Sequence, residues 1–107
     1  MAKVKIPIKR DPAARPRPAP DEPCYIISVA AQIVGLHPQT LRQYDRAGLV
    51  VAYRAHGNRR MYSPRDIRRL QRIVRLTEDL GINLAGVEVI LNMRAQIKRM
   101  RREMDQR

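Results

Sequence analysis

The sequence predicts a mainly α-helical protein with a small β-hairpin wing: a winged helix-turn-helix followed by a short C-terminal dimerisation helix. Three observations lead to this prediction. Two short helical segments meet at a glycine-containing turn, an arginine-bearing hairpin follows them, and the last segment carries apolar residues at heptad spacing. Each pattern arises often by chance, but their order in one chain is far more specific. This order divides the chain into an N-terminal arm (residues 1–23), a winged helix-turn-helix domain (24–91) and a dimerisation helix (92–107).

Residues 1–23 contain six of the eight prolines. Proline removes backbone donors, and this stretch has little apolar surface to bury, so we predict a disordered basic arm. The arm either adds non-specific attraction to DNA or serves as a solubilising tail. Cys24, the single cysteine, is interpreted as incidental, and we expect no metal and no cofactor.

Two short helices are predicted to form the helix-turn-helix, after a β-rich run at residues 25–27. Ser28 is interpreted as the N-cap of the first helix, with Val29, Ile33 and Leu36 on one apolar face. Pro38 has the fixed φ that suits the first position of the second helix. The second helix of this motif enters the major groove, so its exposed side chains are the first candidates to read DNA.

A β-hairpin is predicted directly after the second helix. Residues 49–54 and 59–62 are interpreted as its strands, joined by a turn at residues 56–58. The hairpin places arginines at its tip and flank, and a basic hairpin beside a recognition helix is typical of a wing. Tyr62 is expected to pack beneath it.

Two further helices are predicted to complete the domain. Ser63 and Pro64, with Asp66 as the acid of a capping box, indicate the start of the third helix. Its expected apolar stripe is Ile67, Leu70, Ile73, Val74, Thr77 and Leu80. Gly81 is expected to end it, and the fourth helix is expected to begin at Asn83. The fourth helix is expected to contribute Leu84, Val87, Ile90 and Leu91 to the core.

The last segment has an apolar row with three- and four-residue spacing, which is typical of a coiled-coil seam. The row consists of Ile90, Met93, Ile97, Met100 and Met104. Nothing else in the chain is predicted to cover it, so pairing with a second copy is favoured over docking back on the same domain. We therefore expect a homodimer.

The charge of the chain indicates a polyanionic partner. Twenty-two Lys and Arg residues stand against ten Asp and Glu, for a net charge of +12. Residues 39–77 hold ten arginines and two acids. Nucleic acid is the first candidate. A membrane surface is the second candidate, but no membrane partner is expected, and no apolar run reaches the ~18 residues that span a bilayer. Because no secretory signal is present, we expect a cytoplasmic protein.

The predicted DNA contacts lie on the second helix, in the turn before it and on the wing. Base edges are expected to be reached by Gln39 and Thr40, while Arg42 can read guanine or bind phosphate. The expected contacts to the DNA backbone are His37, Gln43, Tyr44 and Arg46. The wing residues Arg54, Asn58, Arg59 and Arg60 are expected to contact phosphates or the minor groove. For Tyr44, a place in the core is an equal alternative, and for His37 a structural role is favoured.

Residues 39–50, QTLRQYDRAGLV, resemble the recognition-helix signature of the MerR family of bacterial regulators. Residues 59–63 with Asp66 resemble the end of that family's wing. Residues 36–42 with 44–46, and residues 81–86, are similar to its heat-shock repressor branch, HspR. The resemblance covers residues 25–92. Gln43 and Arg59 stand where many members carry aromatic residues, so these backbone contacts are expected to differ.

The resemblance implies a transcription regulator that binds an inverted repeat of double-stranded DNA through an antiparallel helix pair. It favours Arg42 as a groove-facing contact. The heat-shock branch implies repression of chaperone operons, with the chaperone DnaK as a co-repressor. No small-molecule or metal effector is expected, because the seam lacks the cysteines of metal-sensing members and no large C-terminal domain follows it.

Other functional classes fit less well. With two histidines and one cysteine, the sequence offers no nucleophile–base pair, so no enzyme is expected. A monomeric excisionase-like protein would share the wing but would not need the seam. An RNA-binding module usually displays exposed aromatic residues for stacking. An activator of another stress operon in the same family remains the alternative to a repressor.

Overall fold

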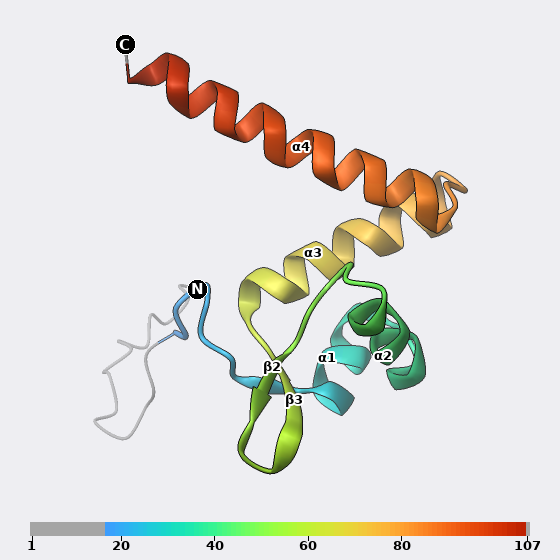
Figure 1. The fold of residues 1–107 in the computed structure, drawn as a ribbon. Coiled ribbons are helices and arrows are strands. Elements are labelled where there is room, and N and C mark those ends of the chain that lie inside the picture. Colours follow the sequence, from blue (N-terminus) through green and yellow to red (C-terminus); the bar gives the residue numbers. More distant parts are fainter. Residues whose placement is uncertain (1–16, 107) are drawn as a thin grey trace, which may run out of the picture.

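The computed structural model describes residues 17–106 and shows four α-helices and a small antiparallel sheet, whose hairpin projects at one edge (Figure 1). Its elements are β1 (Tyr25–Ile26), α1 (Ile27–Val34), α2 (Pro38–Arg46), β2 (Tyr53–Ala55), η1 (His56–Asn58), β3 (Arg59–Tyr62), α3 (Pro64–Val74), η2 (Arg75–Asp79) and α4 (Leu84–Asp105). The sheet order is β1-β3-β2. A helix-turn-helix, a hairpin wing and a C-terminal helix are thus present, as predicted. No helix in residues 17–106 is both long and apolar enough to cross a membrane.

The first helix begins earlier, and faces the core differently, than the sequence predicts. Pairing of β1 with β3 fixes Tyr25 and Ile26, and Ile26 is the N-cap of α1, without a side-chain cap. Ser28 therefore lies inside the helix, and its prediction as N-cap is wrong. Val29 and Ile33 are 39% and 46% exposed. The residues of α1 that face the core are Ala30, Ala31 and Val34.

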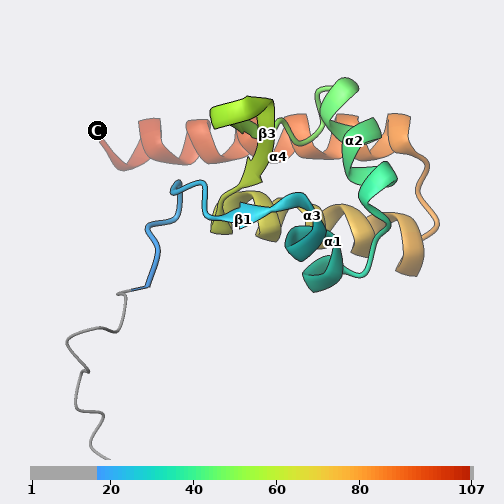
Figure 2. The same cartoon turned by 90° about the horizontal axis from the view of Figure 1, so that it is seen from below.

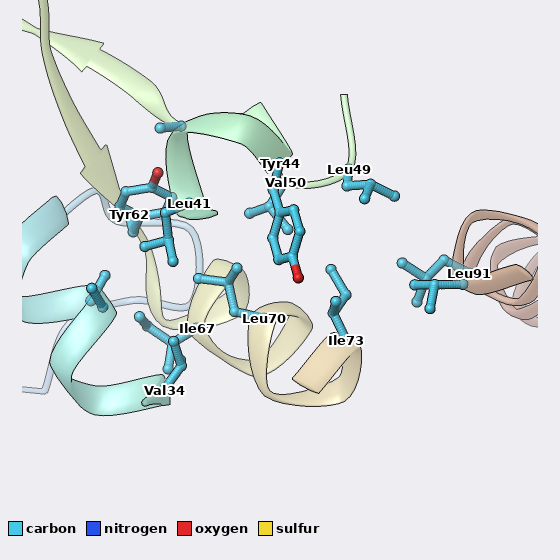
Figure 3. Packing of buried hydrophobic residues seen from close by; sticks show 14 residues of the cluster. Val34, Leu41, Tyr44, Leu49, Val50, Tyr62, Ile67, Leu70, Ile73 and Leu91 are labelled. Carbon is cyan, nitrogen blue, oxygen red and sulfur yellow. The ribbon is translucent and has the colours of Figure 1, made fainter. Parts of the chain in front are cut away.

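One apolar cluster joins α1, α2, the sheet, α3 and the start of α4 (Figure 3). Its largest fully buried side chains are Tyr62, Leu41, Leu70, Ile73, Val50 and Val87. The strand predicted from residue 49 begins only at Tyr53. The backbone N–H of Leu49 instead donates to the Tyr44 carbonyl at 2.9 Å, which ends α2 and turns the chain inward.

Tyr62 lies beneath the hairpin as predicted, with its side chain completely buried. Burial raises the pKa of its hydroxyl. That hydroxyl has no hydrogen-bond partner among the described residues. A buried polar group without a partner costs ~1–3 kcal/mol, so this site carries an uncompensated penalty.

A Tyr62→Phe variant is therefore expected to raise the free energy of unfolding by ~1 kcal/mol, because it removes the buried hydroxyl and keeps the ring. Urea denaturation followed by circular dichroism measures the change. Tyr53→Phe is the matched control, since Tyr53 is 58% exposed and its hydroxyl can reach water. A Tyr62→Phe protein less stable than wild type would show that the hydroxyl is bonded.

The third helix starts with the predicted capping box. The Ser63 hydroxyl accepts from the Asp66 N–H at 3.1 Å, and the Asp66 carboxylate accepts from the Ser63 N–H at 2.9 Å. After Val74 the backbone widens into a π-helical turn, η2, which ends before Gly81 at φ 66°. The wider turn rotates Leu80 outward, so Leu80 is 65% exposed and its predicted place on the buried stripe is wrong.

The fourth helix is one continuous element from Leu84 to Asp105, so the boundary predicted between residues 91 and 92 falls inside it. The Asn83 side chain caps it by accepting from the Gly86 N–H at 2.9 Å. Val87 and Leu91 are buried, whereas Leu84 is 44% exposed and does not join the core. Every residue from 92 to 106 is exposed, and the helix extends past the domain (Figures 1 and 2).

The predicted N-terminal arm lies partly outside the described residues, which begin at Arg17. Its last residues run beside the start of α3. The Arg65 N–H donates to the Pro20 carbonyl at 2.9 Å, and the Arg65 guanidinium pairs with Asp21 at 2.8 Å. The structured part of the chain thus begins before the predicted boundary at residue 23.

Candidate nucleic-acid interface

The second helix is attached to the core by one face and leaves the other free. Leu41 and Tyr44 are buried, while Gln39, Gln43 and Arg46 are exposed on the opposite side. This division follows from the apolar side chains at positions i and i+3 of a short helix. The exposed face therefore presents most of the polar side chains that the sequence predicts to contact DNA.

His37 and Pro38 set the start of this helix. The Nδ1 atom of His37 accepts from the Gln39 N–H at 3.0 Å, so His37 is the N-cap, and Pro38 occupies the first helical position. The capping role accounts for His37 without DNA. Its Nδ1 atom is already occupied, and Nε2 alone remains to contact a phosphate.

Tyr44 lies in the core, and the structure does not support its prediction as a clamp on the DNA backbone. Its side chain is directed towards Ile73 of α3 (Figure 3). Burial, with a smaller contribution from Glu78, raises the pKa of its hydroxyl. Leu41 and Tyr44 are three residues apart, and this spacing already predicts that they share one face of the helix.

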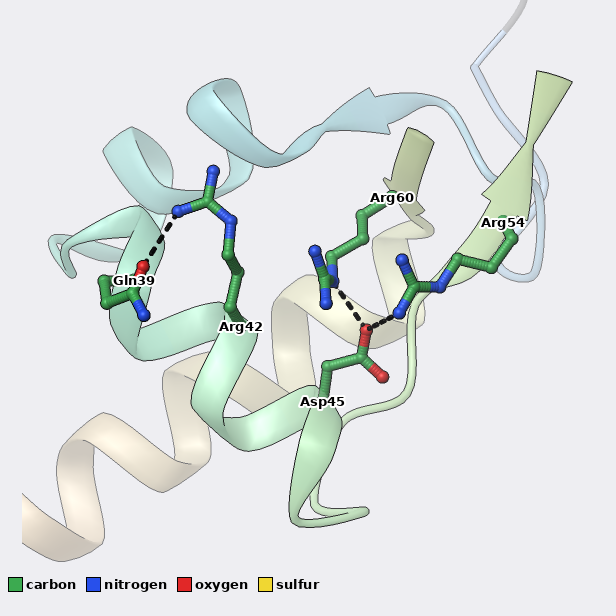
Figure 4. A network of polar contacts seen from close by, with 5 residues as sticks. All are labelled: Gln39, Arg42, Asp45, Arg54 and Arg60. Carbon is green, nitrogen blue, oxygen red and sulfur yellow. Dashed lines mark hydrogen bonds and ion pairs between the residues drawn. The ribbon is translucent and has the colours of Figure 1, made fainter. Parts of the chain in front are cut away.

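Thr40 and Arg42 are half-buried at the edge of the exposed face. The Arg42 guanidinium donates to the Gln39 side-chain oxygen at 3.2 Å (Figure 4). This hydrogen bond joins two of the side chains that are candidates to contact bases, Gln39 and Arg42, before DNA is bound. This bond orients Arg42 along α2 before any ligand is present.

The wing places further cations beside α2. Backbone turns with positive φ at Gly57 and Asn58 form its tip. Arg54, Asn58 and Arg59 are exposed there, and Arg60 is half-buried. An exposed basic hairpin tip can reach the phosphate backbone or the minor groove.

Asp45 joins the wing to the recognition helix. Its carboxylate accepts from the Arg60 Nε at 2.8 Å and from the Arg54 guanidinium at 3.2 Å (Figure 4). The Asp45 side chain is only 7% exposed, and that of Arg60 is 19% exposed. Asp45 therefore acts as a positioning residue for two predicted DNA contacts. Asp45 is not among the site residues predicted from the sequence, although it is one of only two acids among ten arginines in residues 39–77.

A groove of about 300 Å³ separates α2 from the wing. Its lining brings together four residues predicted from the sequence: Arg42, Asn58, Arg59 and Arg60. Ile26 and Ile27, at the junction of β1 and α1, complete the groove and were not predicted as part of it. Gln39, Gln43 and Arg46 lie on α2 outside its lining. Arg42 thus joins the groove to α2.

An Asp45→Asn variant is expected to lose ~2 kcal/mol of stability, because it leaves the part-buried Arg60 without its charged partner. The loosened wing is also expected to lower duplex affinity about tenfold, or ~1.4 kcal/mol. Urea denaturation and fluorescence anisotropy measure the two effects. Asp21→Asn is the matched control, because its pair with Arg65 is largely exposed and such pairs contribute little. Equal behaviour of the two variants would contradict the positioning role.

Residues 25–94 match the family described as MerR HTH family regulatory protein. The chain belongs to the MerR family. This confirms the resemblance carried by the recognition-helix signature, and the matched range contains α1, α2, the wing, α3 and the first half of α4.

Two curated relatives are similar to this chain over most of the same range. The chain is 56% identical over 77 residues to HspR of Streptomyces coelicolor, described as a heat shock protein, across 72% of this chain and 51% of that protein. It is 33% identical over 72 residues to the transcriptional regulator GlnR of Bacillus anthracis, across 67% of this chain and 55% of that protein. The chain thus spans about half the length of these relatives.

A solved structure supports the fold. HiNmlR, a MerR-family regulator that lacks the sensor domain, was solved bound to promoter DNA. It superposes with a TM-score of 0.54 at 21% identity, across 76% of this chain and 78% of that chain. At this identity the likeness concerns the fold.

Proposed function

We propose that this MerR-family chain is a sequence-specific regulator of transcription that represses heat-shock or chaperone genes. It binds an inverted repeat of double-stranded DNA as a homodimer in the bacterial cytoplasm. The observation that carries the proposal is the groove between α2 and the wing, where Arg42, Asn58, Arg59 and Arg60 come together. The similarity to HspR supports the heat-shock assignment.

In this proposal, the exposed face of α2 enters the major groove, and the wing contacts the flanking backbone. Gln39 and Thr40 open the helix, where base edges are reached, and Arg42 follows one turn later. Arg46 and the wing arginines bind phosphates and set the register of the helix on the duplex. Asp45 holds the wing at a fixed angle to α2, so both elements engage together.

The exposed apolar row of α4 supports the homodimer. Met93, Ile97, Met100 and Met104 are 49–70% exposed, and Ile90 is half-buried. The row does not dock back on its own domain in residues 17–106, which was the alternative considered from the sequence. An antiparallel pair would cover it and carry two recognition helices at a fixed spacing, whereas a monomeric excisionase-like protein would leave it exposed.

Selection of bound duplexes from a random pool tests the proposed function. The expected product is an inverted repeat, since a twofold dimer places two identical helices in neighbouring major grooves. Enrichment of single, unsymmetrical sites would reject the dimeric readout. No enrichment of any duplex would reject sequence-specific DNA binding.

The HspR similarity also leads us to propose the chaperone DnaK as co-repressor. The expected result is that purified DnaK increases the affinity of the chain for the selected repeat in an anisotropy titration. The same titration with a scrambled duplex is the control. An unchanged affinity for the repeat would remove DnaK from the proposal.

A further inference from the structure

The crossing of α3 and α4 carries a dense positive charge that lies outside the α2–wing groove. One hollow of about 440 Å³ there is lined by four arginines and one lysine: Arg69, Arg72, Arg94, Lys98 and Arg101. A second hollow of about 480 Å³ is lined by Arg68, Arg72, Arg75 and Arg94. Arg72 and Arg94 belong to both. We call these seven residues and the two hollows the α3–α4 cleft.

No acid of the described chain neutralises this cleft. Within residues 17–106, the ion pairs join Asp45 to Arg54 and Arg60, and Asp21 to Arg65. Neither hollow has an aspartate or glutamate in its lining. The basic surface is therefore not a solvated face in which both signs of charge alternate.

Of the seven cleft cations, Arg69 and Arg72 are half-buried and the other five are exposed. The Arg69 Nε donates to the Leu49 carbonyl at 2.6 Å, which fixes its guanidinium against the domain. Arg72 is half-buried. Burial, together with the charges of Arg94, Arg69 and Arg68, lowers the pKa of the Arg72 guanidinium. The free protein thus holds like charges in a place where an anion would relieve their repulsion.

We propose that the α3–α4 cleft binds phosphate groups. Guanidinium forks match phosphate oxygens in bidentate pairs, and several forks around one hollow favour a multivalent phosphate over a simple halide. Two sources carry this chemistry: the backbone of bound DNA, and a free polyphosphate anion. The first source rests on the proposed function, whereas the second does not depend on DNA.

The position of the cleft also connects it to the apolar row of α4. Ile97 lines the first hollow, and Ile90 lines the second. Neutralising the cations beside these two residues would lower the repulsion between chains that pair through the row. Phosphate binding is therefore expected to strengthen self-association as well.

The first experiment measures tripolyphosphate binding by the full chain without DNA, using the shift in thermal unfolding against sodium chloride at equal ionic strength. An Arg72→Gln/Arg94→Gln variant tests the cleft. An Arg99→Gln/Arg102→Gln variant is the control, because it removes two exposed α4 charges that line neither hollow. We expect the Kd of the cleft variant to rise about tenfold or more above that of the control, from the loss of two charge-assisted contacts.

The second experiment measures the salt dependence of binding to a random-sequence duplex. Each phosphate contact contributes about 0.9 to the slope of log K against log salt. If DNA is the source, the cleft variant has a shallower slope than the control variant. A Lys98→Gln/Arg101→Gln variant repeats both measurements at exposed positions in the lining of the first hollow.

The outcomes separate the two sources. If the cleft variant loses tripolyphosphate binding but keeps the salt slope of the control, the source is a free anion. If its salt slope for duplex binding becomes shallower while tripolyphosphate binding is kept, the source is the DNA backbone. Equal behaviour of the cleft and control variants in both experiments overturns the proposal. Should the wild-type chain bind no duplex, the proposed function fails, and the tripolyphosphate measurement still decides the cleft.

Discussion

An Arg42→Ala variant is expected to bind its operator duplex about 100-fold more weakly than the wild-type dimer, while its fold is unchanged. A bidentate contact between arginine and guanine contributes ~1–3 kcal/mol of discrimination, and a twofold dimer loses two such contacts. The sum of ~2–6 kcal/mol corresponds to 30-fold or more. Arg42 is half-buried, and among residues 17–106 its side chain is bonded only to Gln39, so its removal leaves no buried charge there unpaired.

Two further variants make this prediction specific. Arg46→Ala, at an exposed position of the same helix, is expected to weaken operator and random duplex alike, because it removes a phosphate contact. Arg99→Ala removes the same charge from the far part of α4 and controls for net charge. Anisotropy titrations with both duplexes measure the ratio of the two affinities. If Arg42→Ala keeps the wild-type ratio, Arg42 does not read bases.

The sequence predicts the parts of this fold that depend on local chemistry. Pro38 has no N–H that would need a partner in the first turn, and the Ser63–Asp66 capping box and Asn83 accept from backbone N–H groups within a few residues. Their positions therefore mark helix starts correctly. Gly81 adopts the positive φ that ends the preceding segment. Such signals need no knowledge of the rest of the chain.

The sequence fails where a distant segment decides the outcome. Val29 and Ile33 are larger and more apolar than Ala30 and Ala31, yet the smaller pair faces the core. The rotation of α1 is set by its close packing on α3 and by β1, which pairs with the distant strand β3. Hydrophobic spacing alone does not contain that information.

The candidate DNA-binding residues also divide into those that a local motif predicts and those that depend on how distant segments pack. Gln39, Arg42 and the wing arginines were predicted from their place in the motif, and the structure puts Arg42, Arg59 and Arg60 around one groove. Asp45 was missed because its role depends on the angle between α2 and the hairpin. The α3–α4 cleft was missed because α3 and α4 bring its arginines together only on folding.

An Ile97→Glu variant is expected to dissociate the proposed dimer and to abolish tight operator binding. Ile97 lies at the centre of the apolar row and is 49% exposed in the single chain, so its surface is available to a second copy. Burying an isoleucine contributes ~1.5–3 kcal/mol, and a twofold interface loses two of them. In an antiparallel pair centred on this residue, the two carboxylates would also repel each other and lose their water.

The loss of ~3–6 kcal/mol raises the dimer dissociation constant by 100-fold or more. Sedimentation equilibrium measures that constant, and anisotropy shows whether operator affinity falls with it, since a monomer engages one half-site only. Asn92→Glu is the matched control. It adds the same charge within the exposed part of α4, residues 92–106, but lies outside the apolar row. Because Ile97 contributes nothing to the buried core, the Ile97→Glu chain is expected to fold as a monomer. A variant that stays dimeric would place the contact between chains elsewhere, and the spacing of two recognition helices would then need a different origin.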